Sequence, residues 1–159
     1  MSFFRPFFQW SDGTWVGIAL RRSLWLFPLV ETIHLLALSL FLGTIGILGL
    51  RLFGFAMRRQ KIPQFARDLA PWNIGSLCVV LLSGWCLFAS EAFKCYDSIP
   101  FHIKMVCLFL AVLYHFTIYR KVTQSETSRV TTGRTRLAAA ISLLLWFSVG
   151  LAGRAIGFL

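Results

Sequence analysis

The chain has 159 residues, of which 57% are hydrophobic and 14% charged, and its mean hydropathy is +0.72. A water-soluble domain of this size needs a larger polar share, so this composition excludes a soluble globular protein. The net charge of +10 would suit nucleic acid. The basic residues instead flank long apolar segments, so we expect contacts with membrane lipid and no nucleic-acid binding.

The N-terminal segment, residues 1–23, mixes Phe and Trp with Arg and is interrupted by Pro6. Such a composition is typical of the interface between membrane and water. We therefore predict a short interfacial helix over residues 14–23, with Trp15 and Ile18 facing lipid.

The rest of the chain, residues 24–159, is predicted to be a bundle of transmembrane helices. A helix needs about 20 apolar residues to cross a bilayer. Segments of this length cover residues 24–53, 69–93, 100–120 and 137–158. The predicted fold class is therefore all-α, a four-helix transmembrane bundle with a short interfacial N-terminal helix.

Two local patterns refine these helices. Asp68 is a candidate N-cap for the second helix, with Pro71 in its first turn. In the first helix, Gly43, Gly46 and Gly49 recur at every third position. Glycine rows let another helix approach closely, so self-association into a homo-oligomer is plausible for a bundle of this size.

The distribution of Lys and Arg predicts the orientation of the bundle. The segments after the first and third helices hold ten of these residues, and the other side of the membrane would hold six. The side with more Lys and Arg is the cytoplasmic one. Both termini are therefore predicted to lie outside the cytoplasm.

Ionisable side chains inside the predicted helices are costly in lipid, so each marks a structural or functional contact. With a rise of about 1.5 Å per residue, the four helices bring several of them near one level in the outer part of the bundle. This outer polar cluster consists of Glu31, His34, Glu91, Lys94, His102, Lys104 and Arg154.

One interpretation of this cluster is purely structural. Glu31 would form an ion pair with Arg154 on another helix. Glu91 would pair with Lys94 or Lys104, and these ion pairs would hold the helices together without any ligand.

The second interpretation is a b-type haem site. Two neutral imidazoles on different helices can ligate one haem iron, and bundle cores house such sites. His34 is the first candidate ligand. His102, which is shallower, and His115, which is deeper, are the candidates for the second. Lys104 or Arg154 would neutralise the haem propionates at the outer rim.

Copper is a third interpretation. Cys86 and Cys107 are predicted near the level of His34, and thiolates with an imidazole suit Cu(I). The sequence has no G-x-S-x-G, no H-E-x-x-H and no phosphate-binding glycine loop. We therefore assign no catalytic residue and do not expect the chain to be an enzyme by itself.

Short motifs at the outer polar cluster support a family resemblance. They are E-T-I-H at residues 31–34, S-E-A-F-K at 90–94, F-H-I-K at 101–104 and A-G-R at 152–154. With the apolar segments around them, they resemble an uncharacterised family of small bacterial four-helix integral membrane proteins. That family is distantly similar to the membrane domain of copper-resistance D proteins and to small transmembrane b-type cytochromes.

The resemblance implies a multi-pass protein of the bacterial inner membrane, and the charge count then places both termini in the periplasm. The function that we predict is a haem b-binding electron-transfer subunit that works with a redox or periplasmic partner protein. The alternatives are a cofactor-free scaffold or transporter-like oligomeric bundle, and a Cu(I)-handling membrane protein.

Overall fold

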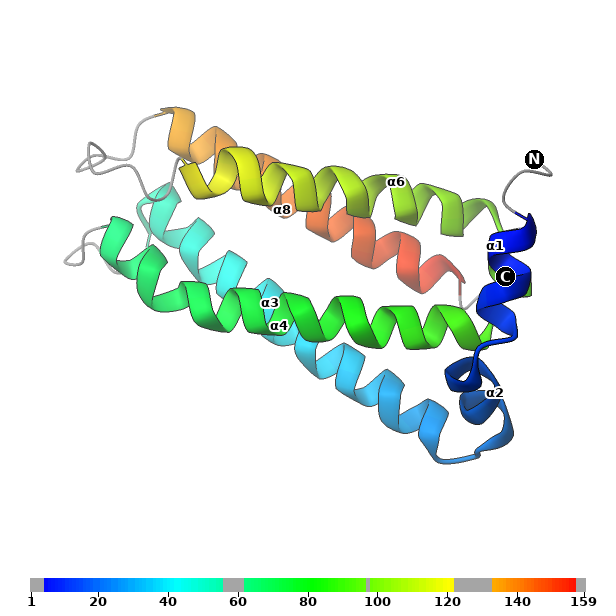
Figure 1. Cartoon of the computed structure of the whole chain (residues 1–159). Helices are drawn as coiled ribbons and strands as arrows, with labels where there is room; N and C mark the ends of the chain where they lie inside the picture. The colour runs from blue at the N-terminus through cyan, green and yellow to red at the C-terminus, as the bar shows by residue number, and fades with distance from the viewer. Residues whose placement is uncertain (1–4, 56–61, 97, 122–132, 157–159) are drawn as a thin grey trace.

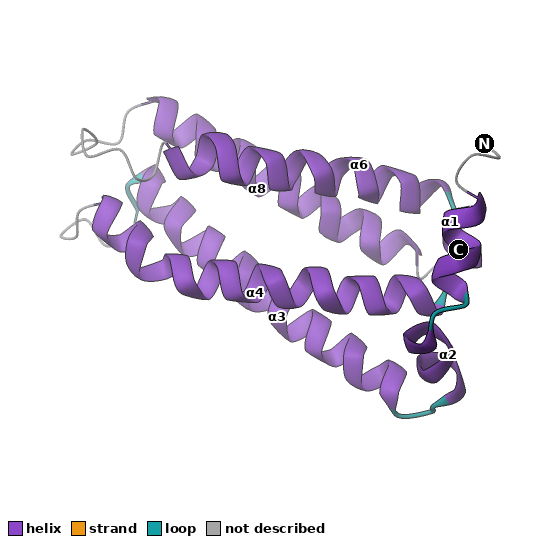
Figure 2. Cartoon of the chain, viewed as in Figure 1, coloured by secondary structure: helices purple, strands orange, loops and turns teal. Residues whose placement is uncertain are grey.

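The computed structural model describes residues 5–55, 62–96, 98–121 and 133–156, and helices make up nearly all of this part of the chain (Figures 1 and 2). In chain order they are α1 (Arg5–Asp12), α2 (Trp15–Arg22), α3 (Leu26–Phe53), α4 (Ile62–Ser90), α5 (Ala92–Tyr96), α6 (Ile99–Tyr114), the π-helix η2 (His115–Tyr119) and α8 (Gly133–Ile156).

Four of these helical segments are long and apolar enough to cross a membrane: α3, α4, α6 with the start of η2, and α8. The prediction of an all-α bundle with four spans is therefore confirmed. Between 17% and 39% of each apolar window is buried inside the protein, with α6 the least buried. Most of the side-chain surface of the spans is consequently available to lipid.

In the described chain, two short helices, α1 and α2, precede the first span. Helix α2 matches the predicted one, and the hydroxyl of its N-cap Thr14 accepts a hydrogen bond of 3.3 Å from the Gly17 N–H. Helix α1 was not predicted, because Pro6 was interpreted as a break. Pro6 instead occupies the first turn, where a helix N–H has no partner to lose.

The predicted start of the second span is wrong. Helix α4 begins at Ile62, so Asp68 does not cap it and Pro71 lies inside it. The charges around this segment suggested a loop. Its apolar side chains nevertheless recur at helical spacing, and packing of that face against α3 stabilises the additional turns.

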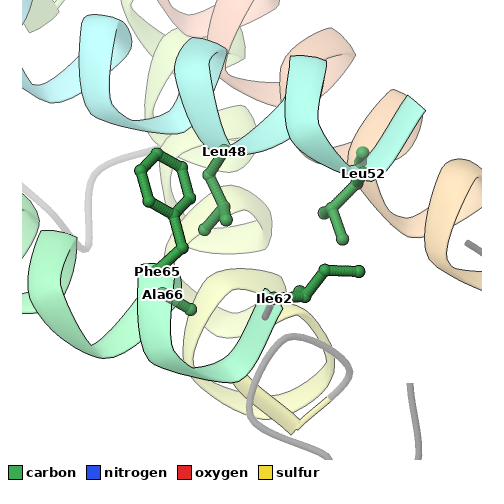
Figure 3. Packing of buried hydrophobic residues seen from close by; sticks show 6 residues of the cluster. Leu48, Leu52, Ile62, Phe65 and Ala66 are labelled. Atoms are coloured by element: carbon green, nitrogen blue, oxygen red, sulfur yellow. The ribbon is translucent and has the colours of Figure 1, made fainter. Parts of the chain in front are cut away.

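Figure 3 shows this packing at the end of the bundle where α3 ends and α4 begins. Leu48 and Leu52 of α3 form a buried cluster with Ile62, Phe65 and Ala66 of α4. Leu52 and Ile62 are almost completely inaccessible to solvent. Burial of these side chains fixes the register between the two helices.

The middle of the bundle is built around Phe41 of α3 and Trp146 of α8. Their rings meet edge to face, with centroids 4.4 Å apart. Helix α3 packs along both α4 and α8, and α6 packs along α8. Towards the other end, the stacked rings of Phe88 and Phe101, 5.3 Å apart, connect α4 with α6.

Helices α1, α2 and α5 lie at one end of the bundle, which is called the N-terminal end below (Figure 1). Phe8 of α1 packs edge to face on Phe88, with ring centroids 5.4 Å apart. Helix α2 approaches the end of α4 so closely that a Cβ added to Gly17 would lie 2.5 Å from the carbonyl oxygen of Ala89. Arg21 also donates a hydrogen bond of 3.4 Å to the carbonyl oxygen of Ser90.

We predict that Gly17→Ala displaces α2 from α4, because the new methyl group would collide with the backbone of Ala89. Overpacking of this kind costs about 1 to 3 kcal/mol. Trypsin should then cleave the purified protein faster after Arg21 and Arg22. Gly43→Ala is the matched control, since a Cβ there meets no atom within 4 Å. Equal cleavage of Gly17→Ala and the unmodified chain would contradict the prediction.

Candidate functional site

His34 lies on α3, half-buried against α4, and its ring has a defined hydrogen-bond partner. Its Nδ1 is 2.8 Å from the Oγ of Ser83. The Ser83 hydroxyl donates its only hydrogen to the Val79 carbonyl oxygen at 2.6 Å, so its Oγ accepts from His34. From these partners we assign the proton of the neutral ring to Nδ1 and the lone pair to Nε2.

Gly84 of α4 lies directly against the His34 ring. A Cβ added to Gly84 would lie 3.3 Å from the His34 Cε1 atom. A side chain at position 84 would therefore require the ring to shift by a few tenths of an ångström. Two consecutive residues of α4, Ser83 and Gly84, thus fix both the direction and the tautomer of His34.

Lys104 extends from α6 towards α8 in the same region of the bundle. Its Nζ lies 3.4 Å from the position of a Cβ added to Gly153, and its Cε lies 3.5 Å from it. The ammonium group is within electrostatic range of the His34 ring and of the Cys95 thiol. In the part of the chain that the structure describes, no carboxylate lies within ion-pair distance of Lys104.

All four spans contribute residues to this region, which is called the His34–Lys104 site below; no hydrogen bond joins the two side chains, but the Lys104 charge acts on the His34 ring. Its members are His34 of α3, Ser83 and Gly84 of α4, Lys104 of α6 and Gly153 of α8. The site combines a fixed cation with a neutral hydrogen-bond acceptor. Such a pair can bind an acidic group, but it has no nucleophile activated by a base.

The predicted contact between Glu31 and Arg154 does not form. Both side chains are exposed, and no ion pair joins them. The reason is the course of α3, whose first turns diverge from α4 and α8 (Figure 1). A residue such as Glu31, one turn before His34, therefore faces the surroundings of the bundle.

Glu91 and Lys94 do form an ion pair, with 3.5 Å between Nζ and Oε1. The pair lies where α4 ends and α5 begins, at the N-terminal end of the bundle. Glu91 is seven residues beyond Gly84, which is about 10 Å along a helix. The pair therefore lies nearer that end of the bundle than Gly84, and it contains neither His34 nor Lys104.

The other two histidines lie away from His34. His102 is exposed, and its Nδ1–H donates a hydrogen bond of 2.8 Å to the Ser98 carbonyl oxygen in its own helix. His115 is buried beside Phe41, with ring centroids 6.0 Å apart. Phe41 is seven residues beyond His34, about 10 Å along α3. The two candidate second ligands, His102 and His115, are therefore not packed beside His34 in the described chain.

A second polar location lies near His115 in the other half of the bundle. The Asn73 Nδ2 donates a hydrogen bond of 2.8 Å to the Thr44 Oγ1, which donates in turn to the Phe41 carbonyl oxygen. Asn73 and Thr44 line a cavity of about 30 Å³ together with His115 and Arg120. That volume suits about one water molecule and excludes a larger ligand.

The cysteines do not gather around His34. Among the described residues, no three His, Cys, Asp or Glu side chains lie close enough together to hold a metal ion. Cys86 and Cys107 therefore form no three-ligand copper site with His34. Cys95 of α5 is buried, and this burial, with a smaller contribution from the Glu91 carboxylate, raises the pKa of its thiol.

Sequence reasoning identified His34 and Lys104 but missed the residues that position them. Helix α4 holds other polar residues besides Ser83, and neither Gly84 nor Gly153 was connected with His34 or Lys104. Nothing in their spacing indicates which side chain each one faces. That information comes from the packing of α3 on α4 and of α6 on α8.

The fold and the site define the class of protein: a multi-pass α-helical bundle with a polar site between four apolar spans. The sequence matches a family of unknown function, DUF6644, over residues 7–159, and the chain belongs to that family. No curated protein and no solved structure matches the sequence at a significant level.

We predict that Ser83→Ala releases the His34 ring, because Nδ1–H then loses its acceptor. Nitrogen NMR of ¹⁵N-labelled histidine should show a single Nδ1-protonated tautomer in the native protein and a mixture in the variant. The stability loss should be small, about 0.6 kcal/mol for such an interhelical bond. Ser39→Ala is the control, because Ser39 donates only to its own helix, at 2.9 Å. An unchanged tautomer in Ser83→Ala would contradict the assignment.

Proposed function

We propose that the protein is a non-catalytic membrane subunit that binds the acidic group of a membrane-soluble molecule at the His34–Lys104 site. Lys104 supplies the countercharge, and the Nε2 of His34 accepts a hydrogen bond. One observation carries the proposal: Lys104 is half-buried against α8, and no carboxylate of the described chain pairs with it.

The energetics favour a role for an anion. Lys104 lies beside the last turn of α8, and the negative end of a helix dipole stabilises a cation by about 0.3 to 1 kcal/mol. A charged lysine in a transmembrane helix costs up to about 2.5 to 3.5 kcal/mol at the bilayer centre. The dipole offsets part of this cost, and an acidic ligand on Lys104 would offset the remainder.

The position of the site indicates how a ligand reaches it. His34 lies eight residues after the start of α3, about 12 Å along the helix. Most of the surface around it is apolar and open to lipid. A molecule with an acidic group and a long apolar part could therefore enter from the bilayer, with its apolar part remaining in lipid.

The test is binding of oleic acid by the detergent-purified protein, measured by equilibrium dialysis with methyl oleate as the uncharged comparison. Lys104→Gln should weaken oleate binding about tenfold or more, because a hydrogen bond to a charged group contributes about 1.5 to 3 kcal/mol. Lys121→Gln is the matched control, since Lys121 is exposed outside the spans. Equal affinity for oleic acid and methyl oleate would refute the proposal.

Haem b is a second candidate ligand, and the tautomer of His34 favours it. Histidines that ligate a metal usually donate their other ring N–H to a neighbouring acceptor, as His34 does to Ser83. Nε2 would be the only protein ligand from an imidazole, and Lys104 would hold a propionate. Haem would supply one-electron transfer, as the resemblance to small b-type cytochromes implies.

The haem candidate predicts a visible spectrum. Protein expressed with added haem should show a Soret band of a haem with a single histidine ligand, and His34→Ala should abolish it. His102→Ala should leave it unchanged, because His102 is exposed and bonded to its own helix. A spectrum without a Soret band in well-folded native protein would remove this candidate.

The cofactor-free alternative is a scaffold or transporter-like oligomer. A Cβ added to Gly43 or Gly46 meets no other atom within 4 Å, so the start of the α3 glycine row does not serve packing within the described chain. A second copy of the protein could use that face. The inner membrane and the periplasmic termini stay predictions of the charge count and the family resemblance.

A further inference from the structure

A groove opens at the N-terminal end of the bundle, separate from the His34–Lys104 site. Its volume is about 590 Å³, within the range of small-molecule pockets. One wall is the start of α3 with the residues just before it, including Leu24 and Phe27. The opposite wall is the junction of α4 and α5, with Glu91 and Lys94.

The groove exists because α2 holds the two walls apart. The first turns of α3 diverge from α4, and α2 lies at the wide end of the wedge (Figure 1). Gly17 lets α2 pack directly on Ala89, and Arg21 bonds the Ser90 carbonyl oxygen. These contacts attach α2 to the end of α4 and hold Arg21 at the groove.

The polar rim of the groove carries both signs of charge. Arg21 pairs with Asp12, and Lys94 pairs with Glu91. The Lys94 side chain is 80% exposed and that of Glu91 43%, so both can also reach a ligand. A ligand that complements this rim needs an anion and a cation a few bonds apart.

The apolar wall has a composition typical of the membrane interface. Leu24 is 89% exposed and Trp25 84%, and exposed tryptophans are typical of the headgroup level. Trp15 of α2 is 82% exposed at the same end of the bundle. An acyl chain could therefore lie along Leu24 and Phe27 while its headgroup remains at the rim.

We propose that this groove binds one phospholipid with a phosphoethanolamine headgroup. Its phosphate would contact Lys94 and Arg21, and its ammonium would donate hydrogen bonds to Glu91. A phosphocholine headgroup has no N–H to donate, and a phosphoglycerol headgroup has no cation. Both should therefore bind less well, although they have the same acyl chains.

The test is native mass spectrometry of the delipidated protein after addition of phosphatidylethanolamine, phosphatidylcholine or phosphatidylglycerol with matched acyl chains. One phosphatidylethanolamine should be retained about fivefold more than either of the others, as one charge contact of roughly 1 kcal/mol implies. Glu91→Gln should abolish the preference over phosphatidylglycerol. Lys121→Gln, at the other end of the bundle, should leave it unchanged.

Gly17→Ala tests the groove without altering its charges. Displacement of α2 should lower retention of phosphatidylethanolamine even though Arg21, Glu91 and Lys94 remain. Circular dichroism verifies that each variant is folded. Equal retention of the three lipids, or retention that neither Glu91→Gln nor Gly17→Ala changes, would show only non-specific boundary lipid and would overturn the proposal. Binding at Lys104 is not involved, so failure of the oleate experiment leaves this result unaffected.

Discussion

The bilayer core contains no water that could hydrogen-bond to the backbone. The N–H and C=O groups of a span must therefore form their hydrogen bonds within their own helix. The exposed hydroxyl groups of this protein follow the same rule. Thr32, Ser39 and Ser148 each donate to the carbonyl oxygen four residues earlier. Polar contacts between helices are therefore few, and each one restricts how two helices can pack. His34 with Ser83 and Asn73 with Thr44 are two such contacts between α3 and α4.

The same constraint explains the role of glycine at the His34–Lys104 site. A polar side chain inside a bundle needs both a partner and space beside a neighbouring helix, and apolar side chains otherwise fill that space. Gly84 leaves room for the His34 ring, and Gly153 leaves room for the Lys104 chain. Both ionisable side chains therefore lie against a glycine of a neighbouring helix, where the absence of a side chain reduces the crowding around them.

The spans were predictable because hydropathy over about 20 residues measures the property that lipid selects. The helix boundaries were less predictable, because whether a short segment is helical depends on what it packs against. Helix α4 extends back to Ile62 because the apolar face of its first turns packs against α3 (Figure 3). Helix α1 forms although Pro6 suggested a break, and Phe8 then packs on the end of the bundle. In both cases tertiary packing stabilises a helix that the local sequence does not specify.

The candidate site was predictable only in part, and helix geometry explains which part. Sequence depth placed His102 and Lys104 together near His34, yet two residues are about 200° apart around a helix. Only one of them can face the neighbouring helices, and the packing of α6 on α8 selects Lys104. His102 consequently lies on the outside, where its ring bonds its own helix. Depth along the membrane normal can be read from a sequence, whereas rotation about each helix axis is fixed by contacts between helices. The structure thus places Lys104, and not His102, on the face of α6 that packs on α8, which is a difference of rotation at nearly constant depth.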